Sequence, residues 1–194
     1  MKVTNQNLAI FASGSGSNAE AFFKYFRGNK NINICLLLSN NKKAFALRRA
    51  EKYGVPTVTF DRHEFYETDR VLSTLKEHHI SFIVLAGFLW KIPIELIENY
   101  QGKMVNIHPA LLPKFGGKGM YGMHVHKAVI EADEKESGIT IHYVTENYDE
   151  GEIIFQEKCE VKPADLPETL AERIQKLEHK FYPQVVEKTL SVFQ

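Results

Sequence analysis

The chain has 194 residues, of which 44% are hydrophobic and 25% charged, and its 24 basic side chains equal its 24 acidic ones. This length and composition are typical of a globular protein, so we expect residues 1–194 to form one domain of ordinary size. The charge balance argues against a nucleic-acid-binding protein, which usually has a basic excess or stripe, but it leaves a small phosphorylated ligand open.

No secretion signal and no membrane span is predicted. The first seven residues contain no apolar run of signal-peptide length, and the longest apolar stretch, Phe82 to Trp90, is far too short to cross a bilayer. Two cysteines are too few for a disulfide framework, since Cys35 lies in an apolar run and Cys159 has no His nearby. We therefore expect a cytoplasmic protein, and the sequence leaves open whether it is a monomer or a homodimer.

The N-terminal half alternates short apolar runs with helical patterns. Strands are predicted at Leu8–Ala12, Ile32–Ser39, Thr57–Phe60, Phe82–Ala86 and Lys103–Ile107. Helices are predicted between them at Ala19–Arg27, Ala44–Tyr53, Phe65–His78 and Pro93–Tyr100. This order favours an α/β, doubly wound fold, which is a mostly parallel sheet with helices on both faces. In such a fold, ligands bind beyond the carboxyl ends of the strands.

The first predicted strand leads directly into a serine- and glycine-rich turn, Ser13-Gly14-Ser15-Gly16-Ser17-Asn18, which opens the first helix. Glycines let the backbone approach a ligand closely, and a helix N-terminus presents unpaired N–H groups, so a phosphate is the expected ligand. The turn with Ala19 also fits the dinucleotide pattern G-x-G-x-x-A, but the second strand ends in Ser39-Asn40-Asn41, without the acidic residue that would bind a ribose. A monophosphate is therefore favoured over a dinucleotide, and a plain capped turn is the remaining alternative.

The fifth strand ends in Asn106-Ile107-His108-Pro109. Because side chains alternate along an extended chain, Asn106 and His108 project to the same side, and Pro109 keeps His108 extended. An amide donor beside an imidazole suits an acyl-transfer site, where the amide stabilises an oxyanion and the imidazole moves protons. The alternative is a buried pair that satisfies the backbone groups of a loop.

The pattern changes after Pro113, and the last third is expected to be the mixed part of the fold. A glycine-rich loop, Phe115 to Gly122, precedes a predicted helix, two strands and a long closing helix, which are Val125–Ala132, Gly138–Thr145, Ile153–Val161 and Pro167–Leu190.

The two late strands are joined by Thr145–Gly151, which contains Asp149 and Glu150. In isolation, acidic residues beside a glycine indicate a solvated turn. A site with Asn106 and His108, however, needs a carboxylate that fixes the imidazole tautomer and raises its pKa, and these two residues are the candidates.

Among the eight histidines, His124 and His126 together with His108 suggest a metal site. Residues two apart do not share a helix face, and no carboxylate or thiol stands at ligand spacing, so no metal is expected. His142 and His179 lie in patterned elements and are expected to be packed or to cap a helix.

These motifs occur in an order that resembles the formyltransferases that use 10-formyltetrahydrofolate. The similarity covers essentially the whole chain and includes Leu111-Leu112-Pro113, Val84–Phe88 and Arg173–His179. Within that family, the glycine-rich turn and the segment around Glu178 are similar to the enzymes that formylate 5'-phosphoribosylglycinamide (glycinamide ribonucleotide) in de novo purine biosynthesis.

The resemblance implies that residues 1–194 are a single formyltransferase catalytic domain in which Asn106, His108 and Asp149 are catalytic. It also implies that the Ser13–Asn18 backbone binds the ribonucleotide phosphate and that Glu178 contacts the ribose hydroxyls. The folate pterin is placed in a pocket lined by Phe88, Leu89, Trp90, Lys91, Ile92 and Val144 and by the loop Thr145–Gly151, where backbone groups would make most of the contacts. The implied partners are two small molecules, with no metal, nucleic acid or membrane.

Other functions remain open at this point. They are formyl transfer to another amine, hydrolysis of the formyl-folate, and a non-catalytic folate- or nucleotide-binding module. The sequence also departs from the family: Trp90 stands where many relatives carry Arg, and the Lys114–Met123 loop is longer and richer in Gly. In addition, Arg62, His63 and Arg70 do not align securely with the basic phosphate partner of some relatives.

Overall fold

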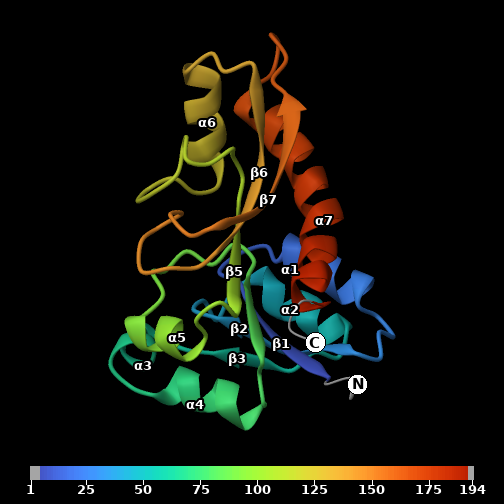
Figure 1. Cartoon of the computed structure of the whole chain (residues 1–194), viewed down its shortest axis with the longest axis vertical. Helices are drawn as coiled ribbons and strands as arrows, with labels where there is room; N and C mark the ends of the chain where they lie inside the picture. The colour runs from blue at the N-terminus through green and yellow to red at the C-terminus, as the bar shows by residue number, and fades with distance from the viewer. Residues whose placement is uncertain (1–4, 192–194) are drawn as a thin grey trace.

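The computed structural model describes residues 5–191, which contain a seven-stranded sheet in the order β3-β2-β1-β4-β5-β6-β7 (Figure 1). The elements in chain order are β1 (Gln6–Phe11), α1 (Ser17–Tyr25), β2 (Ile32–Ser39), α2 (Phe45–Lys52), β3 (Thr57–Thr59), α3 (Arg62–Tyr66), α4 (Arg70–Glu77), β4 (Phe82–Leu85), α5 (Ile94–Asn99), β5 (Met104–His108), α6 (Met123–Glu131), β6 (Glu136–Tyr143), β7 (Ile153–Glu160) and α7 (Pro167–Ser191).

The first five strands run parallel to one another, whereas β6 is antiparallel to β5 and β7 is antiparallel to β6. The predicted doubly wound, mostly parallel α/β sheet with a mixed C-terminal part is therefore confirmed. Parallel pairing also requires helical crossovers between the strands, and the helices between β1 and β5 supply them.

Each face of the sheet carries its own hydrophobic core. Along β1, Leu8 and Ile10 lie in a core with residues of α1, α2, α6 and α7, whereas Ala9 and Phe11 lie in a second core with residues of α3, α4 and α5. All four side chains are at most 1% exposed. Since both faces need apolar side chains, the central strands read as continuous apolar runs rather than as alternating patterns.

The predicted helix Phe65–His78 is wrong, because the structure has two helices there, α3 and α4. The first begins earlier than predicted, at a capping box in which Asp61 accepts from the Glu64 N–H and Glu64 accepts from the Asp61 N–H. The Thr68 hydroxyl then donates to the Glu64 carbonyl and accepts from the Arg70 N–H, which separates the two helices.

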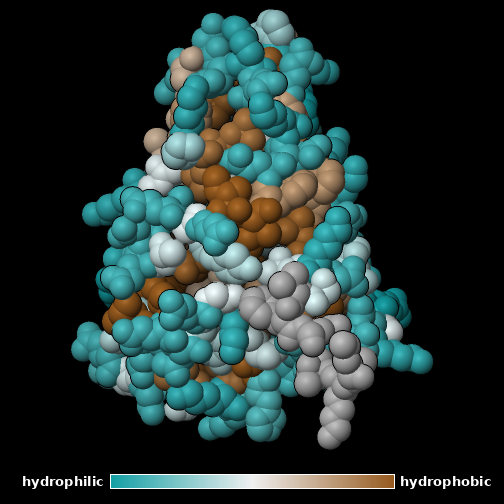
Figure 2. All heavy atoms as spheres, in the orientation of Figure 1, coloured by the Kyte–Doolittle hydropathy of each residue, from teal (hydrophilic) through white to brown (hydrophobic). Residues whose placement is uncertain are grey.

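Polar side chains cover most of the face in Figure 2, and hydrophobic residues gather at mid-height, over β7 and α7. Phe155 of β7 and Phe181 of α7 are in contact, with ring centroids 5.3 Å apart. Across residues 5–191, no helix is both long enough and apolar enough to span a membrane.

Candidate active site

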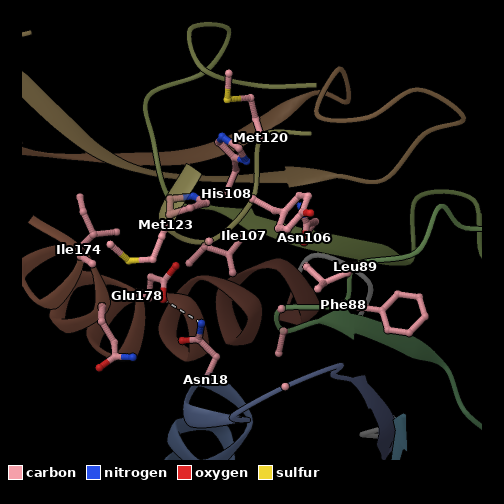
Figure 3. A pocket seen from close by; sticks show the side chains of 18 of the residues that line it. Asn18, Phe88, Leu89, Asn106, Ile107, His108, Met120, Met123, Ile174 and Glu178 are labelled. Carbon is pink, nitrogen blue, oxygen red and sulfur yellow. Dashed lines mark hydrogen bonds between the residues drawn. The ribbon is translucent and has the colours of Figure 1, made fainter. Parts of the chain in front are cut away.

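Three strand ends meet at the carboxyl edge of the sheet, because β1, β4 and β5 are neighbours in it. The ends of β1 and β4 are joined by two hydrogen bonds of 3.0 Å, from the Ser13 N–H to the Gly87 carbonyl and from the Leu89 N–H to the Ser13 hydroxyl oxygen. The residues that follow these strands line a cavity of about 600 Å³, which is also lined by residues 117–123 and by residues of α7. Figure 3 shows Asn18, Glu178, Asn106 and His108 around this space.

Asn106 and His108 line the cavity from β5, as their spacing on the strand predicts. His108 is only 3% exposed. Its Nε2 lies 2.8 Å from the Phe115 carbonyl oxygen, and its Nδ1 lies 3.5 Å from Asp149 Oδ2. Both neighbours are acceptors, so only the doubly protonated imidazole donates to both of them.

Asp149 reaches this imidazole from the loop between β6 and β7. Its Oδ2 accepts from the Gly117 N–H at 2.9 Å, and its Oδ1 lies 3.5 Å from His142 Nε2. The loop packs tightly against the end of β6, because a Cβ on Gly151 would overlap the Tyr143 carbonyl oxygen. Of the two candidate carboxylates, Asp149 contacts His108, whereas Glu150 is exposed and accepts from the Asn147 amide.

Burial and the neighbouring charges shift the pKa values of His108 and Asp149 in opposite directions. Burial lowers the pKa of His108 below its ordinary value, although the Asp149 charge and the Phe115 carbonyl both raise it. The expectation that Asp149 raises the pKa of this imidazole therefore holds for that contact alone, and burial outweighs it. Burial raises the pKa of Asp149, but its contacts with His142, His108 and the Gly117 N–H together hold that pKa below the usual value.

His142 is a member of the cluster that the sequence analysis missed. It pairs with Asn106 across the antiparallel β5–β6 ladder, and its Nε2 lies 3.2 Å from Asn106 Nδ2. Its Nδ1 donates to the Tyr143 carbonyl at 2.8 Å, and its Nε2 lies between the Asn106 amide and Asp149 Oδ1. His126 also lines the cavity, is 5% exposed, and has a buried Nδ1 without a partner among residues 5–191.

The glycine-rich turn forms the opposite wall of the cavity. Gly16 has φ +70°, and no side chain caps α1, which begins at Ser17. Asn18 donates to Glu178 Oε2 at 3.0 Å, whereas its own Oδ1 is buried and has no partner within the described part of the chain. Burial raises the pKa of Glu178 to about 7, against the opposing hydrogen bond from Asn18. Gln175, which the sequence analysis did not single out, donates to the Ser17 hydroxyl oxygen at 3.2 Å.

A second, smaller hollow adjoins the cavity and shares Asn106 and Asp149 with it. It has a volume of about 60 Å³. Five of the six residues expected around a pterin line it, and these are Phe88, Trp90, Lys91, Ile92 and Val144. The sixth, Leu89, is 51% exposed and lines the larger cavity.

The three basic residues near the third helix do not line the cavity at the turn. The Arg62 guanidinium lies 5.0 Å from the Tyr66 ring and 6.0 Å from the Trp90 ring. Arg70 is paired with Glu64, and His63 lies 3.9 Å from a Glu67 carboxylate oxygen. Within residues 5–191, no group of three or more His, Cys, Asp or Glu side chains is arranged to bind a metal ion.

Comparisons with known proteins agree on one kind of enzyme. The family model described as formyl transferase matches residues 6–186. Phosphoribosylglycinamide formyltransferase of Bacillus subtilis is 36% identical over 192 residues, covering 96% of each chain. The chloroplastic enzyme of the same name from Arabidopsis thaliana is 40% identical over 187 residues, and the chain spans 64% of that relative's length. Among solved structures, phosphoribosylglycinamide formyltransferase from Bacillus halodurans is 37% identical, with a TM-score of 0.87 and 97% of both chains covered.

Proposed function

The chain belongs to the formyl transferase family, and we propose that it transfers the formyl group of 10-formyltetrahydrofolate to the amine of 5'-phosphoribosylglycinamide, a step of de novo purine biosynthesis. One observation carries this proposal. The amide of Asn106, the imidazole of His108 and the carboxylate of Asp149 converge where the larger cavity meets the smaller hollow. Two substrates bound in these spaces meet at the three side chains.

The larger cavity fits a phosphorylated ribose. Its volume of about 600 Å³ lies within the usual range of ligand sites. We assign the phosphate to the backbone N–H groups of the Ser13–Asn18 turn, which opens a helix. Glu178 faces the same space and, as a carboxylate, accepts hydrogen bonds from ribose hydroxyls.

The smaller hollow fits the chemistry of a pterin, although not its size in this state. Phe88, Trp90, Ile92 and Val144 offer apolar walls, and the backbone of residues 145–149 offers polar groups for the edge of a ring. Its volume of about 60 Å³ is well below that of ordinary ligand sites, so folate binding requires the 145–149 segment or the surrounding side chains to move outward.

The chemical step uses direct attack of the amine on the formyl carbon, and no protein nucleophile takes part. Asn106 donates its amide N–H to the oxygen that becomes negative, and His108 as imidazolium stabilises the same charge. His108, directly or through a water, then helps to move the proton from the attacking amine to the departing folate nitrogen. Asp149 fixes the ring and favours its protonated form.

The test is to follow deformylation of 10-formyltetrahydrofolate by absorbance, with and without 5'-phosphoribosylglycinamide. Product that forms only when the amine is present supports the proposal. Equal rates without the amine indicate a hydrolase, activity with a different amine alone indicates another transferase, and no reaction under any condition indicates a binding module. Each of the last three results contradicts the proposal.

A further inference from the structure

The N-terminal part of α2 packs directly on the predicted phosphate-binding turn. The Ala46 N–H donates to the Gly14 carbonyl at 3.1 Å, and a Cβ on Gly16 would lie 2.5 Å from the Ala46 Cα. One turn further along α2, Arg49 Nε donates to the Ser15 carbonyl at 2.9 Å. Two successive carbonyl groups of the turn are therefore bound by α2.

These two bonds determine where the N–H groups of the turn point. A peptide unit is planar and trans, so a carbonyl and the N–H that follows it point in opposite directions. With the Gly14 and Ser15 carbonyls directed to α2, the N–H groups of Ser15 and Gly16 are directed away from it. Neither they nor the Ser17 N–H has an acceptor among residues 5–191, and all three residues line the cavity. Successive free N–H groups of this kind form a concave binding site for anions.

Arg49 is itself fixed in place. Its guanidinium pairs with the carboxylate of Glu20, which is 9% exposed, and lies 5.0 Å from the Phe45 ring. The same carboxylate lies 3.3 Å from Lys24 Nζ and accepts a hydrogen bond of 3.2 Å from the Tyr53 hydroxyl. Arg49 and Lys24 thus share the single negative charge of Glu20, so this group carries a net positive charge at the Ser15 peptide, and that charge attracts an anion.

We infer that Arg49 is the positioning residue for the phosphate of the amine substrate. It does not line the cavity and acts through the Ser15 peptide, which it orients so that the Gly16 N–H faces the ligand. It also supplies a fixed positive charge close to that N–H. This inference rests on the proposed function, and it assigns to α2 the basic role that Arg62, His63 and Arg70 do not fill.

The experiment compares Arg49→Ala with Arg48→Ala, because Arg48 is the neighbouring residue on α2, is exposed, and has no partner within the described chain. The kcat and KM of each protein are measured with phosphoribosylglycinamide and with the same molecule lacking the phosphate. For Arg49→Ala we expect kcat/KM to fall roughly 10- to 100-fold with the phosphorylated substrate, through KM, as for loss of a hydrogen bond that supports a charged group. With the dephosphorylated substrate it should stay within about two-fold of the wild type. Arg48→Ala should match the wild type with both.

Equal losses with the two substrates would show that Arg49 only supports the fold, and the inference would be overturned. A wild type without preference for the phosphorylated substrate would overturn it as well, while formyl transfer itself would stand. A wild type that formylates neither amine refutes the proposed function instead. Arg49→Gln keeps a donor for the Ser15 carbonyl and decides the question if Arg49→Ala does not fold. It should retain part of the phosphate preference, and complete retention would show that the charge has no role.

Discussion

Replacing Asp149 by Asn isolates the contribution of one negative charge. The change preserves the size of the side chain, and the amide oxygen still accepts from the Gly117 N–H, so the loop between β6 and β7 keeps its anchor. What disappears is the carboxylate 3.5 Å from His108 Nδ1. Both side chains of this pair are nearly buried, at 4% and 10% exposure, so solvent screens the lost interaction only weakly.

The size of the effect follows from this geometry. Unit charges 3.5 Å apart attract each other by about 4 to 5 kcal/mol at an effective dielectric constant of about 20. The amide dipole of Asn recovers part of this energy, and every 1.4 kcal/mol of lost transition-state stabilisation slows the reaction ten-fold. We therefore expect kcat to fall about 10²- to 10³-fold at neutral pH.

The assay is kcat against pH with both substrates saturating. Asp149 raises the pKa of His108, so its removal lowers that pKa further, and the imidazolium should be lost at a lower pH in the variant than in the wild type.

The contacts of Asp149 hold its own pKa below the ordinary carboxyl value, so the ionised carboxylate stabilises the folded protein at any pH above that ordinary value. This stabilisation is lost as the pH falls through the lowered pKa. The variant should thus have the lower Tm at pH 7, and the difference should narrow in acid. Glu150→Gln is the control, and a kcat of Asp149→Asn within three-fold of the wild type across the pH range would refute the reasoning.

Three further predictions concern the walls of the two spaces. Asn106→Ala should lower kcat about 10²- to 10³-fold with little change in either KM, and an unchanged kcat would exclude the amide as the oxyanion donor. The wild-type KM for the ribonucleotide should rise as the pH falls below about 7, where the Glu178 carboxylate becomes protonated, and Glu178→Gln should lose this pH dependence. The same variant should have a higher Tm than the wild type at pH 8, where the buried charge is a cost, but not at pH 4, and the reverse order would contradict the burial argument. Gly16→Ala places a Cβ 2.5 Å from the Ala46 Cα at a backbone φ of +70°, so both the Tm and the affinity for the ribonucleotide should fall. An unaltered KM for the ribonucleotide would show that the turn does not bind this substrate.

The parts of the fold that follow from local chemistry could be read from the sequence. The runs Leu8–Ala12 and Phe82–Ala86 are apolar at every position, and the structure places helices on both faces of them, as that pattern predicts. The neighbouring positions of Asn106 and His108 followed from strand geometry alone. The residues alone left Asp149 and Glu150 as candidates, and the family resemblance pointed to Asp149. Its contacts with His108 and Gly117 distinguish it from Glu150 in the structure.

The parts that depend on register or on long-range contacts could not be read in this way. His142 joins the cluster because it pairs with Asn106 across an antiparallel ladder whose register no local pattern specifies. Arg49 meets the Ser15 carbonyl from 34 residues away, and Glu178 meets Asn18 across 160 residues. Leu89 lines the larger cavity. Periodicity could not predict this direction of its side chain, because residues 86–93 are neither strand nor helix.

The hydrogen bond between His108 and Phe115 links the imidazole that we propose to be catalytic to the glycine-rich loop. An imidazole with acceptors at both nitrogens is satisfied only when doubly protonated, whereas burial favours the neutral ring. A developing oxyanion in the cavity is a third acceptor, and it competes with the Phe115 carbonyl for the same Nε2 proton, because Asp149 already lies at Nδ1. Since the oxyanion carries a full charge and the carbonyl only a dipole, we expect the Nε2–H group to donate its hydrogen bond to the oxyanion. We therefore expect formation of the transition state to weaken the hydrogen bond between His108 and the Phe115 carbonyl.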